Sequence, residues 1–245
     1  MKNIPNHQIL ITLFKRYKLT NNEQEELLAI IINIYVHDEF QRRLTNEFPH
    51  HGKTTLGEHI LKVTIVTYKH LKKRPKKKAK LDIAVKIAML HDLYTLPWQD
   101  SPIKDKRFIN KHGFRHPIEA VVNSSIWFPE LFEKEEEAKM IIDGIIHHMY
   151  PFPSIKYIDS LDNLMELRNF ELVENINENI KKLIINSSKR GRLKSISFKP
   201  SKYSEGKIVC YADTIASLTD FKKLNDVKAL VGIRGKKIRI KKKDK

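Results

Sequence analysis

The segment from Ile83 to Leu90 constrains the fold most, because it is almost wholly apolar and is followed at once by His91 and Asp92. A helix that is apolar on every side is buried among other elements. A carboxylate at the end of such a helix is costly unless a partner compensates its charge. The sequence therefore predicts a central helix over 82–93 that carries two ionisable groups into the core. A bound cation is the compensation that we favour, and a salt bridge to a lysine is the alternative.

Periodic apolar positions predict further helices around this one. They cover 21–48, a segment from Thr55 toward Leu71, a segment that starts at Pro117, and the ranges 133–148 and 206–221. Thr55 and Glu58 have the spacing of a capping box, and a proline at the first helical position would leave His116 at the cap. Strands and helices do not alternate, and no long repeat is visible. We therefore expect an all-α fold, a single helical bundle.

The chain of 245 residues is long enough for one substantial domain. We expect this domain over 1–233, with its core at about 36–158 and 205–222. The range 159–204 is polar, with one helical portion near 164–185 and a Ser-Lys-Arg-Gly turn, so it is interpreted as an insertion packed on the outside. The range 234–245 is a basic tail.

The formal charge of +17 is concentrated in two runs, one between Lys72 and Lys80 and the other from Lys236 to Lys245. Such a field attracts anions. It favours a phosphate-bearing partner, and nucleic acid is one candidate for the basic runs. The alternative is that lysine-rich segments are merely solvated.

Several classes are excluded by what the chain lacks. A single cysteine, Cys210, rules out an intramolecular disulfide or a cysteine-rich zinc site and is expected to be a small core residue. The longest apolar run, 27–36, is about half of what a bilayer crossing needs, and the N-terminus has no signal-peptide pattern. We expect a soluble, cytoplasmic protein without a membrane partner.

Most of the eleven histidines lie between His50 and His148, several of them at the ends of apolar helices. Neutral imidazoles and carboxylates together suit Zn, Mn and Fe. A second His-Asp pair, His37 and Asp38, precedes a run of charged residues and is expected on a solvated helix face. This clustering predicts a site for a divalent transition metal built from histidine and aspartate.

These residues resemble the HD-domain metal-dependent phosphohydrolases. The family has a histidine on one helix, a His-Asp pair at the end of the next, and an aspartate on a later helix. The matches here are His59 in Gly-Glu-His-Ile, His91 and Asp92 in Met-Leu-His-Asp-Leu, and Asp213 in Tyr-Ala-Asp-Thr. Further histidines are similar to the two-metal subset of the family, namely His116 in Phe-Arg-His-Pro and the pair His147 and His148 in Ile-Ile-His-His-Met-Tyr-Pro. The resemblance covers about 36–220 and is nearest to uncharacterised bacterial HD-domain proteins.

The resemblance implies one or two divalent ions, with Fe, Mn and Zn as the first candidates and Mg, Ni and Co as further ones. The first ion would be held by His59, His91, Asp92 and Asp213, and the second by Asp92, His116, His147 and His148. It implies metal-activated water that cleaves a phosphomonoester or phosphodiester of a nucleotide-like substrate. Asp92 would bridge the ions, and Lys53, Lys62 and Arg115 are candidates for holding phosphate oxygens, with Arg115 favoured.

Two departures limit what the resemblance implies about the substrate. Leu93 to Leu96 replace the motif that follows His-Asp in alarmone hydrolases, and Met149 to Pro153 replace the Gly-Tyr-Pro extension of cyclic dinucleotide phosphodiesterases. Two alternatives stay open. One is a di-iron oxygenase with the same ligand set, and the other is a basic RNA-binding module with a structural metal site.

Overall fold

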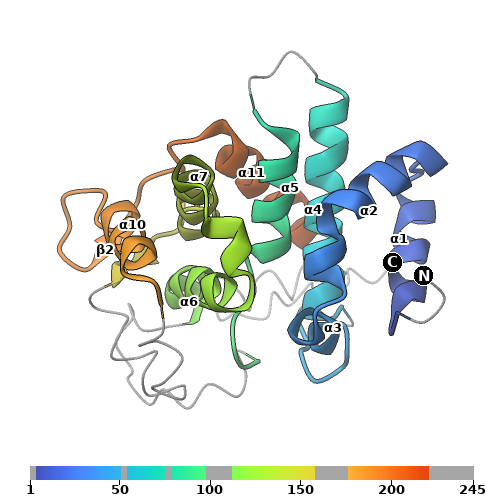
Figure 1. The fold of residues 1–245 in the computed structure, drawn as a ribbon, viewed down its shortest axis with the longest axis horizontal. Helices are drawn as coiled ribbons and strands as arrows, with labels where there is room; N and C mark the ends of the chain where they lie inside the picture. The colour runs from blue at the N-terminus through green and yellow to red at the C-terminus, as the bar shows by residue number, and fades with distance from the viewer. Residues whose placement is uncertain (1–3, 51–53, 75–78, 98–111, 158–175, 221–245) are drawn as a thin grey trace, which may run out of the picture.

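The computed structural model describes residues 4–50, 54–74, 79–97, 112–157 and 176–220 (Figure 1). Within this part of the chain the elements are helices, apart from one short antiparallel sheet, so the predicted all-α class is confirmed. The helices are α1 (His7–Arg16), α2 (Asn21–Tyr35), α3 (Asp38–Arg43), α4 (Leu56–Lys72), α5 (Leu81–Leu90), α6 (His112–Trp127), the 3-10 helix η3 (Pro129–Phe132), α7 (Glu135–Ile146), α10 (Glu178–Ser188) and α11 (Ser204–Asp220). The sheet pairs β1 (Ser154–Ile155) with β2 (Ile196–Ser197).

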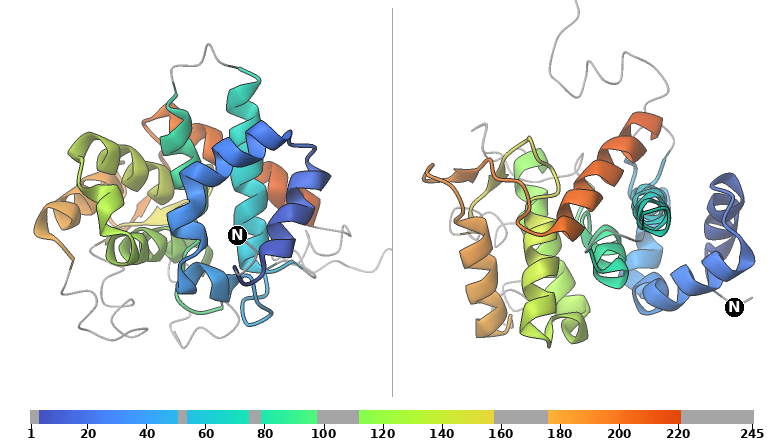
Figure 2. Two further views of the ribbon diagram at one scale, coloured as in Figure 1. Left: turned by 45° about the vertical axis from the view of Figure 1, so that its right-hand side comes forward. Right: turned by 90° about the horizontal axis from the view of Figure 1, so that it is seen from above.

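Helix α5 lies at the centre, as its apolar sequence predicts. It packs against α4, α11, α7 and α2, and its side chains from Ile83 to Val85 and from Ile87 to Leu90 are fully buried. Seen from above, the bundle has α10 at one side and α1 at the other, with α5 between them (Figure 2). The described helices share one continuous hydrophobic core.

Glycines allow three of these helices to approach closely. A Cβ atom at Gly144 of α7 would lie 2.7 Å from Cδ1 of Ile87 in α5. A Cβ atom at Gly206 of α11 would lie 2.7 Å from the Cα atom of Gly144. A Cβ at Gly206 would meet backbone, whereas one at Gly144 would require the Ile87 side chain to move. The two glycines let α7 lie close to both α5 and α11.

Helix α4 begins where the sequence predicts. Thr55 is its N-cap, and the Thr55 hydroxyl accepts a hydrogen bond from the Glu58 amide at 3.2 Å. Near its start, His59 contacts Asp220 at the end of α11, whereas near its end His70 packs on Tyr211. The two helices therefore run in opposite directions.

The predicted single helix over 21–48 is wrong, because helix α2 ends at Tyr35 and a separate helix, α3, begins at Asp38. His37 caps α3 instead, its Nδ1 accepting a hydrogen bond from the Glu39 amide. The Gln41 side chain donates to the Tyr35 carbonyl at 2.6 Å, which satisfies a backbone group that the break leaves open. Apolar periodicity on both sides of the break hides it from the sequence.

The predicted start at Pro117 is also wrong, since α6 begins at His112 and contains Pro117. The fixed φ of proline is compatible with a helix, and what it removes is the one hydrogen bond to the Gly113 carbonyl. His116 is therefore inside the helix rather than at its cap. The predicted helix over 133–148 is present as α7, but it ends at Ile146 and leaves His147 and His148 just beyond it.

The described part of the predicted insertion is joined to the bundle. Helix α10 packs on α7, and the buried Asp143 of α7 accepts hydrogen bonds from Arg190 at 2.6 Å and from the Ser201 hydroxyl at 2.7 Å. Gly191, at the end of the predicted turn, has a φ of +102°. The remainder of the predicted helical portion and the predicted tail lie outside the described residues.

Two further expectations concern the surface. Cys210, expected in the core, is only partly buried and its thiol donates to the Tyr150 carbonyl at 3.0 Å. Of the helices described, none combines the length and the apolar character that a membrane span requires.

Candidate metal centre

Six of the predicted ligands come together where α5 ends. They lie on α4, on the turn after α5, on α6, after α7 and on α11, and they are His59, His91, Asp92, His116, His148 and Asp213. Helix α5 ends at Leu90, and a turn in which the Leu93 amide donates to the Leu90 carbonyl carries His91 and Asp92. Five of them are buried, and the side chain of Asp213 is 13% exposed.

The two carboxylate oxygens of Asp92 face different pairs of histidines. Oδ2 lies 3.4 Å from Nε2 of His91 and 3.9 Å from Nε2 of His59. Oδ1 lies 3.2 Å from Nε2 of His116 and 3.5 Å from Nε2 of His148. Asp92 thus stands between two groups of nitrogen atoms.

Backbone carbonyls fix the orientation of three of these rings. The Nδ1 atom of His91 lies 2.8 Å from the Ala88 carbonyl. The Nδ1 atom of His116 lies 3.2 Å from the His112 carbonyl, and that of His148 lies 2.7 Å from the Ile145 carbonyl. A carbonyl only accepts hydrogen bonds, so Nδ1 carries the proton in each ring. The Nε2 atom of the neutral imidazole then presents a lone pair.

These lone pairs point at one another and at Asp92. Nε2 of His116 lies 3.1 Å from Nε2 of His148. Among the described residues, Nε2 of His91 and Oδ1 of Asp92 are buried without a hydrogen-bond partner. Clustered acceptors without a donor repel one another and lose hydration.

A cation between these atoms would remove that penalty. Two donor atoms bound to one ion at about 2.1 Å, with an angle of roughly 90° to 110° between them, lie about 3.0 to 3.4 Å apart. The separations of 3.1 and 3.2 Å around His116 agree with this, and those of 3.4 and 3.5 Å are close to it. The residues present therefore fit a divalent metal ion.

His59 has a different environment, with a carboxylate at each ring nitrogen. Nε2 lies 3.1 Å from Oδ1 of Asp213, and Nδ1 lies 2.9 Å from Oδ2 of Asp220. Burial lowers the pKa of His59, but hydrogen bonds to the two carboxylates outweigh burial and raise the pKa to about 10. A proton and a metal ion compete for Nε2 of such a histidine.

Burial lowers the pKa of His148, but the hydrogen bond to Asp92 outweighs burial and raises it, so a proton competes with a metal ion there as well. The pKa values of three other groups are shifted in directions that suit ligands. Burial lowers the pKa of His91 to about 4, so its ring is neutral. Burial alone would raise the pKa of Asp92, but the surrounding imidazoles, His91 first, hold it well below its usual range. The pKa of Asp213 is likewise lowered, chiefly by its hydrogen bond to His59, against the effect of burial. Both carboxylates are therefore ionised.

Four predicted site residues lie elsewhere or cannot be placed. Nε2 of His147 is 3.2 Å from the Ser187 carbonyl, so this ring turns toward α10 and does not join the cluster. The Lys62 ammonium is 2.6 Å from Asp220, which directs it to a carboxylate rather than to open space. Arg115, which precedes His116 in α6, is buried, and Lys53 lies outside the described residues.

Three residues near the centre were not predicted. His50 could share an ion with His59 and Asp92, and its ring centroid is 4.2 Å from that of His59. His112 stacks on His116 at 5.1 Å, and burial, the largest cause, holds its pKa well below the usual value. Asp220 is seven positions after Asp213, two helical turns along one face, and this spacing is the signal that could have identified it.

The second His-Asp pair is not part of the centre. His37 packs edge-on against Phe128, with ring centroids 4.8 Å apart, and Asp38 is exposed. Neither residue belongs to a group of described side chains that could hold a metal. The expectation that His37 is solvated is wrong, because it caps α3 and is partly buried.

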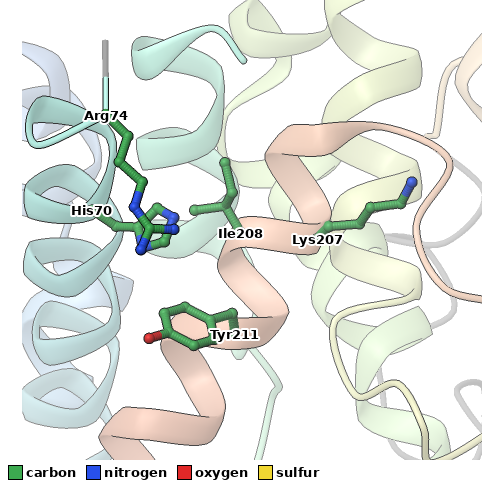
Figure 3. Close-up of a pocket in the computed structure, with 5 residues that line it drawn as sticks. All are labelled: His70, Arg74, Lys207, Ile208 and Tyr211. Atoms are coloured by element: carbon green, nitrogen blue, oxygen red, sulfur yellow. The ribbon is translucent and has the colours of Figure 1, made fainter. Parts of the chain in front are cut away.

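A hollow of about 380 Å³ lies away from this centre, between the end of α4 and the first part of α11 (Figure 3). Arg74 and His70 come from α4 and the residues after it, and Lys207 and Tyr211 come from α11. Ile208 forms its apolar floor. Tyr211 is 50% exposed and its ring packs on His70. Arg74 lies on the same side as these two rings, whereas the Lys207 side chain extends away from them (Figure 3).

No protein-family model, no curated protein and no solved structure matches this chain. Imidazole nitrogen with carboxylate oxygen suits Zn, Mn and Fe, whereas Ca and Mg favour oxygen alone. Cys210 is not among the groups that could hold a metal, so thiolate ligation is absent from the described set.

Proposed function

We propose that this chain is a metal-dependent phosphohydrolase with a centre for two divalent ions. The observation that carries the proposal is Asp92, whose two oxygens face separate pairs of Nε2 atoms. His59, His91, Asp92 and Asp213 would hold the first ion. Asp92, His116 and His148 would hold the second, and His147 is left out because its ring faces Ser187.

Two bound ions would supply a water that ionises near neutral pH and would neutralise charge on a phosphoryl group. The chain itself contributes the arrangement. Asp92 keeps two metal positions adjacent, and the carbonyls of Ala88, His112 and Ile145 fix which nitrogen of each ring is available. Arg115, which is buried and precedes His116 in α6, is our candidate for holding non-reacting phosphate oxygens. The positive charge of the chain favours a phosphorylated, nucleotide-like substrate.

The test begins with the metal content of the purified protein, measured by elemental analysis. Metal-free protein is then reloaded with Mn, Zn, Fe or Mg and assayed with p-nitrophenyl phosphate, bis(p-nitrophenyl) phosphate and a panel of nucleotides. We expect up to two ions per chain and phosphate release that requires them. Protein that binds no ion would contradict the proposal.

The same donor set also suits a di-iron oxygenase. Oxygen uptake by the iron-loaded protein, without cleavage of any phosphoester, would favour that reaction instead.

A second candidate function is binding of single-stranded RNA, and the hollow beside Tyr211 favours it. Basic side chains that follow a phosphate backbone, together with an exposed aromatic ring that stacks on a base, are the usual elements of such sites. This function is compatible with a catalytic centre, because the hollow and the centre are at opposite ends of the α4 and α11 pair. Under this candidate alone, the metal site would be structural.

A further inference from the structure

His59 is joined to a buried ion pair that the proposed ligand set does not include. Its Nδ1 donates to Oδ2 of Asp220 at 2.9 Å, and the other oxygen of Asp220 is 2.6 Å from the Lys62 ammonium. The side chains of Asp220 and His59 are each 1% exposed, and that of Lys62 is 3% exposed. The same ammonium is also 2.9 Å from Oε1 of Glu58, so the two carboxylates share it.

Stability alone is a poor explanation for this pair. Two charges lose their hydration on burial, and their attraction often does no more than repay that loss. Helix α4 is also already fixed by its cap at Thr55 and by an extensive apolar face. The arrangement does, however, have a specific effect on His59, since it decides which nitrogen carries the proton.

His59 differs in this respect from the other ligands of the cluster. His91, His116 and His148 each donate Nδ1–H to a neutral backbone carbonyl. His59 donates instead to a carboxylate. A carboxylate partner makes the opposite nitrogen of the ring more basic and fixes the ring orientation. Nε2 of His59, which faces Asp213 and Asp92, would then be a strong donor to the first ion.

We propose that Asp220 is a positioning residue for the first metal position and that Lys62 holds the Asp220 carboxylate in place. Asp220 acts through His59 and touches neither ion. Lys62 then supports the metal centre through its contact with Asp220, rather than by holding phosphate. This inference rests on the proposed function, because it needs a metal at His59.

The test compares Asp220→Asn with the unchanged protein by titrating Co²⁺ into metal-free samples and following visible absorption and heat of binding. The amide can still accept from His59 but has no charge. We expect the affinity for the first ion to fall about 10- to 100-fold, with the second ion little affected. Lys62→Met should weaken the first ion less. Glu26→Gln, which alters a carboxylate paired with Lys72 on the outer face of α4, is the matched control and should change neither affinity.

The outcomes separate this inference from the proposed function. If the unchanged protein binds no Co²⁺, the proposed function fails. If it binds two ions and Asp220→Asn binds them with equal affinity, or loses both equally, the positioning role is overturned. Should Asp220→Asn fail to fold, the double variant Asp220→Asn with Lys62→Met removes both charges of the pair at once, and Glu58, the other partner of Lys62, is 29% exposed and can be hydrated. Unaltered first-site affinity in that variant would also overturn the inference.

Discussion

Asp92 is the residue on which both proposed metal positions depend, because its Oδ2 faces His59 and His91 while its Oδ1 faces His116 and His148. We predict that Asp92→Ala loses both ions, since each position loses its only bridging ligand. Elemental analysis after dialysis against Mn²⁺ or Zn²⁺ measures this directly.

The matched control for the bridge is His116→Ala. It should lose the second ion and keep the first, because no ligand of the first position is altered. Normal two-ion occupancy in Asp92→Ala would show that this carboxylate does not bridge.

The adjacent residues His147 and His148 have different roles in the structure, which the sequence could not distinguish. The Nε2 atom of His148 faces Asp92, whereas that of His147 faces the Ser187 carbonyl. We predict that His148→Ala loses the second ion and that His147→Ala retains both, as measured by Co²⁺ titration. Equal losses from the two variants would mean that the rings exchange roles when metal binds.

The pattern of the sequence located most of the centre because ligands at helix ends follow apolar segments that can be recognised. It could not separate two adjacent histidines, since their directions depend on the backbone just after α7. His147 has φ −109° and ψ 15°, outside the helical region. Nor could it place His50, which lies in a loop without periodicity.

Substitution of the second His-Asp pair, His37 and Asp38, tests whether this histidine is structural or a metal ligand. His37→Ala combined with Asp38→Ala should retain metal, because neither residue reaches the centre. The variant should nevertheless be less stable by about 1 kcal/mol, since His37 caps α3. Chemical denaturation and metal analysis of the same sample test both parts, and loss of metal with the fold intact would contradict the assignment.

At the scale of elements, the close crossing of α7 and α11 predicts a specific sensitivity. In Gly206→Ala, the added methyl group would lie 2.7 Å from the backbone of Gly144, and backbone does not yield easily. We expect a loss of about 1 to 3 kcal/mol, seen as a Tm lower by about 2 to 4 °C per kcal/mol in a chain of this size.

Gly113→Ala is the matched control for that crossing. Gly113 is also helical, but a Cβ there meets nothing within 4 Å. Alanine in a helix is favoured over glycine by up to about 1 kcal/mol, so stability should hold or rise. If both variants lose stability equally, the cost does not come from the helix crossing.

The helices that the sequence predicted best are those whose own residues specify them. Helix α4 has its cap at Thr55, and α5 is almost wholly apolar from Ile83 to Leu90. The missed features depend on distant contacts. Helix α1 has no side-chain cap and is stabilised where Leu10, Leu13 and Phe14 are buried in the bundle. The break after Tyr35 depends on the Gln41 side chain, which no periodicity reveals.

At the scale of the whole molecule, a charge of +17 attracts any polyanion, so net charge alone does not identify which residues would contact RNA. The hollow between α4 and α11 and the basic run 236–245 are separate candidates. RNA binding at the two places would respond differently to substitution, because the hollow contains an aromatic ring and the run has none.

We predict that Arg74→Ala combined with Lys207→Ala weakens binding of single-stranded RNA and flattens its salt dependence by about 0.7 units of slope for each lost phosphate contact. Tyr211→Ala should weaken binding without changing the slope, because stacking releases no counterions. Lys139→Ala, which removes a partly exposed lysine paired with Glu135 and Glu136, is the control. Fluorescence anisotropy at several salt concentrations measures affinity and slope together.

Removal of 236–245 separates a charged partner from a charged substrate. If this run binds RNA, its loss should lower RNA affinity and flatten the salt dependence, while turnover of a small phosphoester stays unchanged. A small substrate needs the metal centre and nearby groups such as Arg115, which the truncation leaves in place. Turnover that disappears while metal content and fold persist would assign the run to the active site. RNA affinity that is unaltered by the truncation but reduced by the Arg74 and Lys207 substitutions would confine nucleic-acid binding to the hollow.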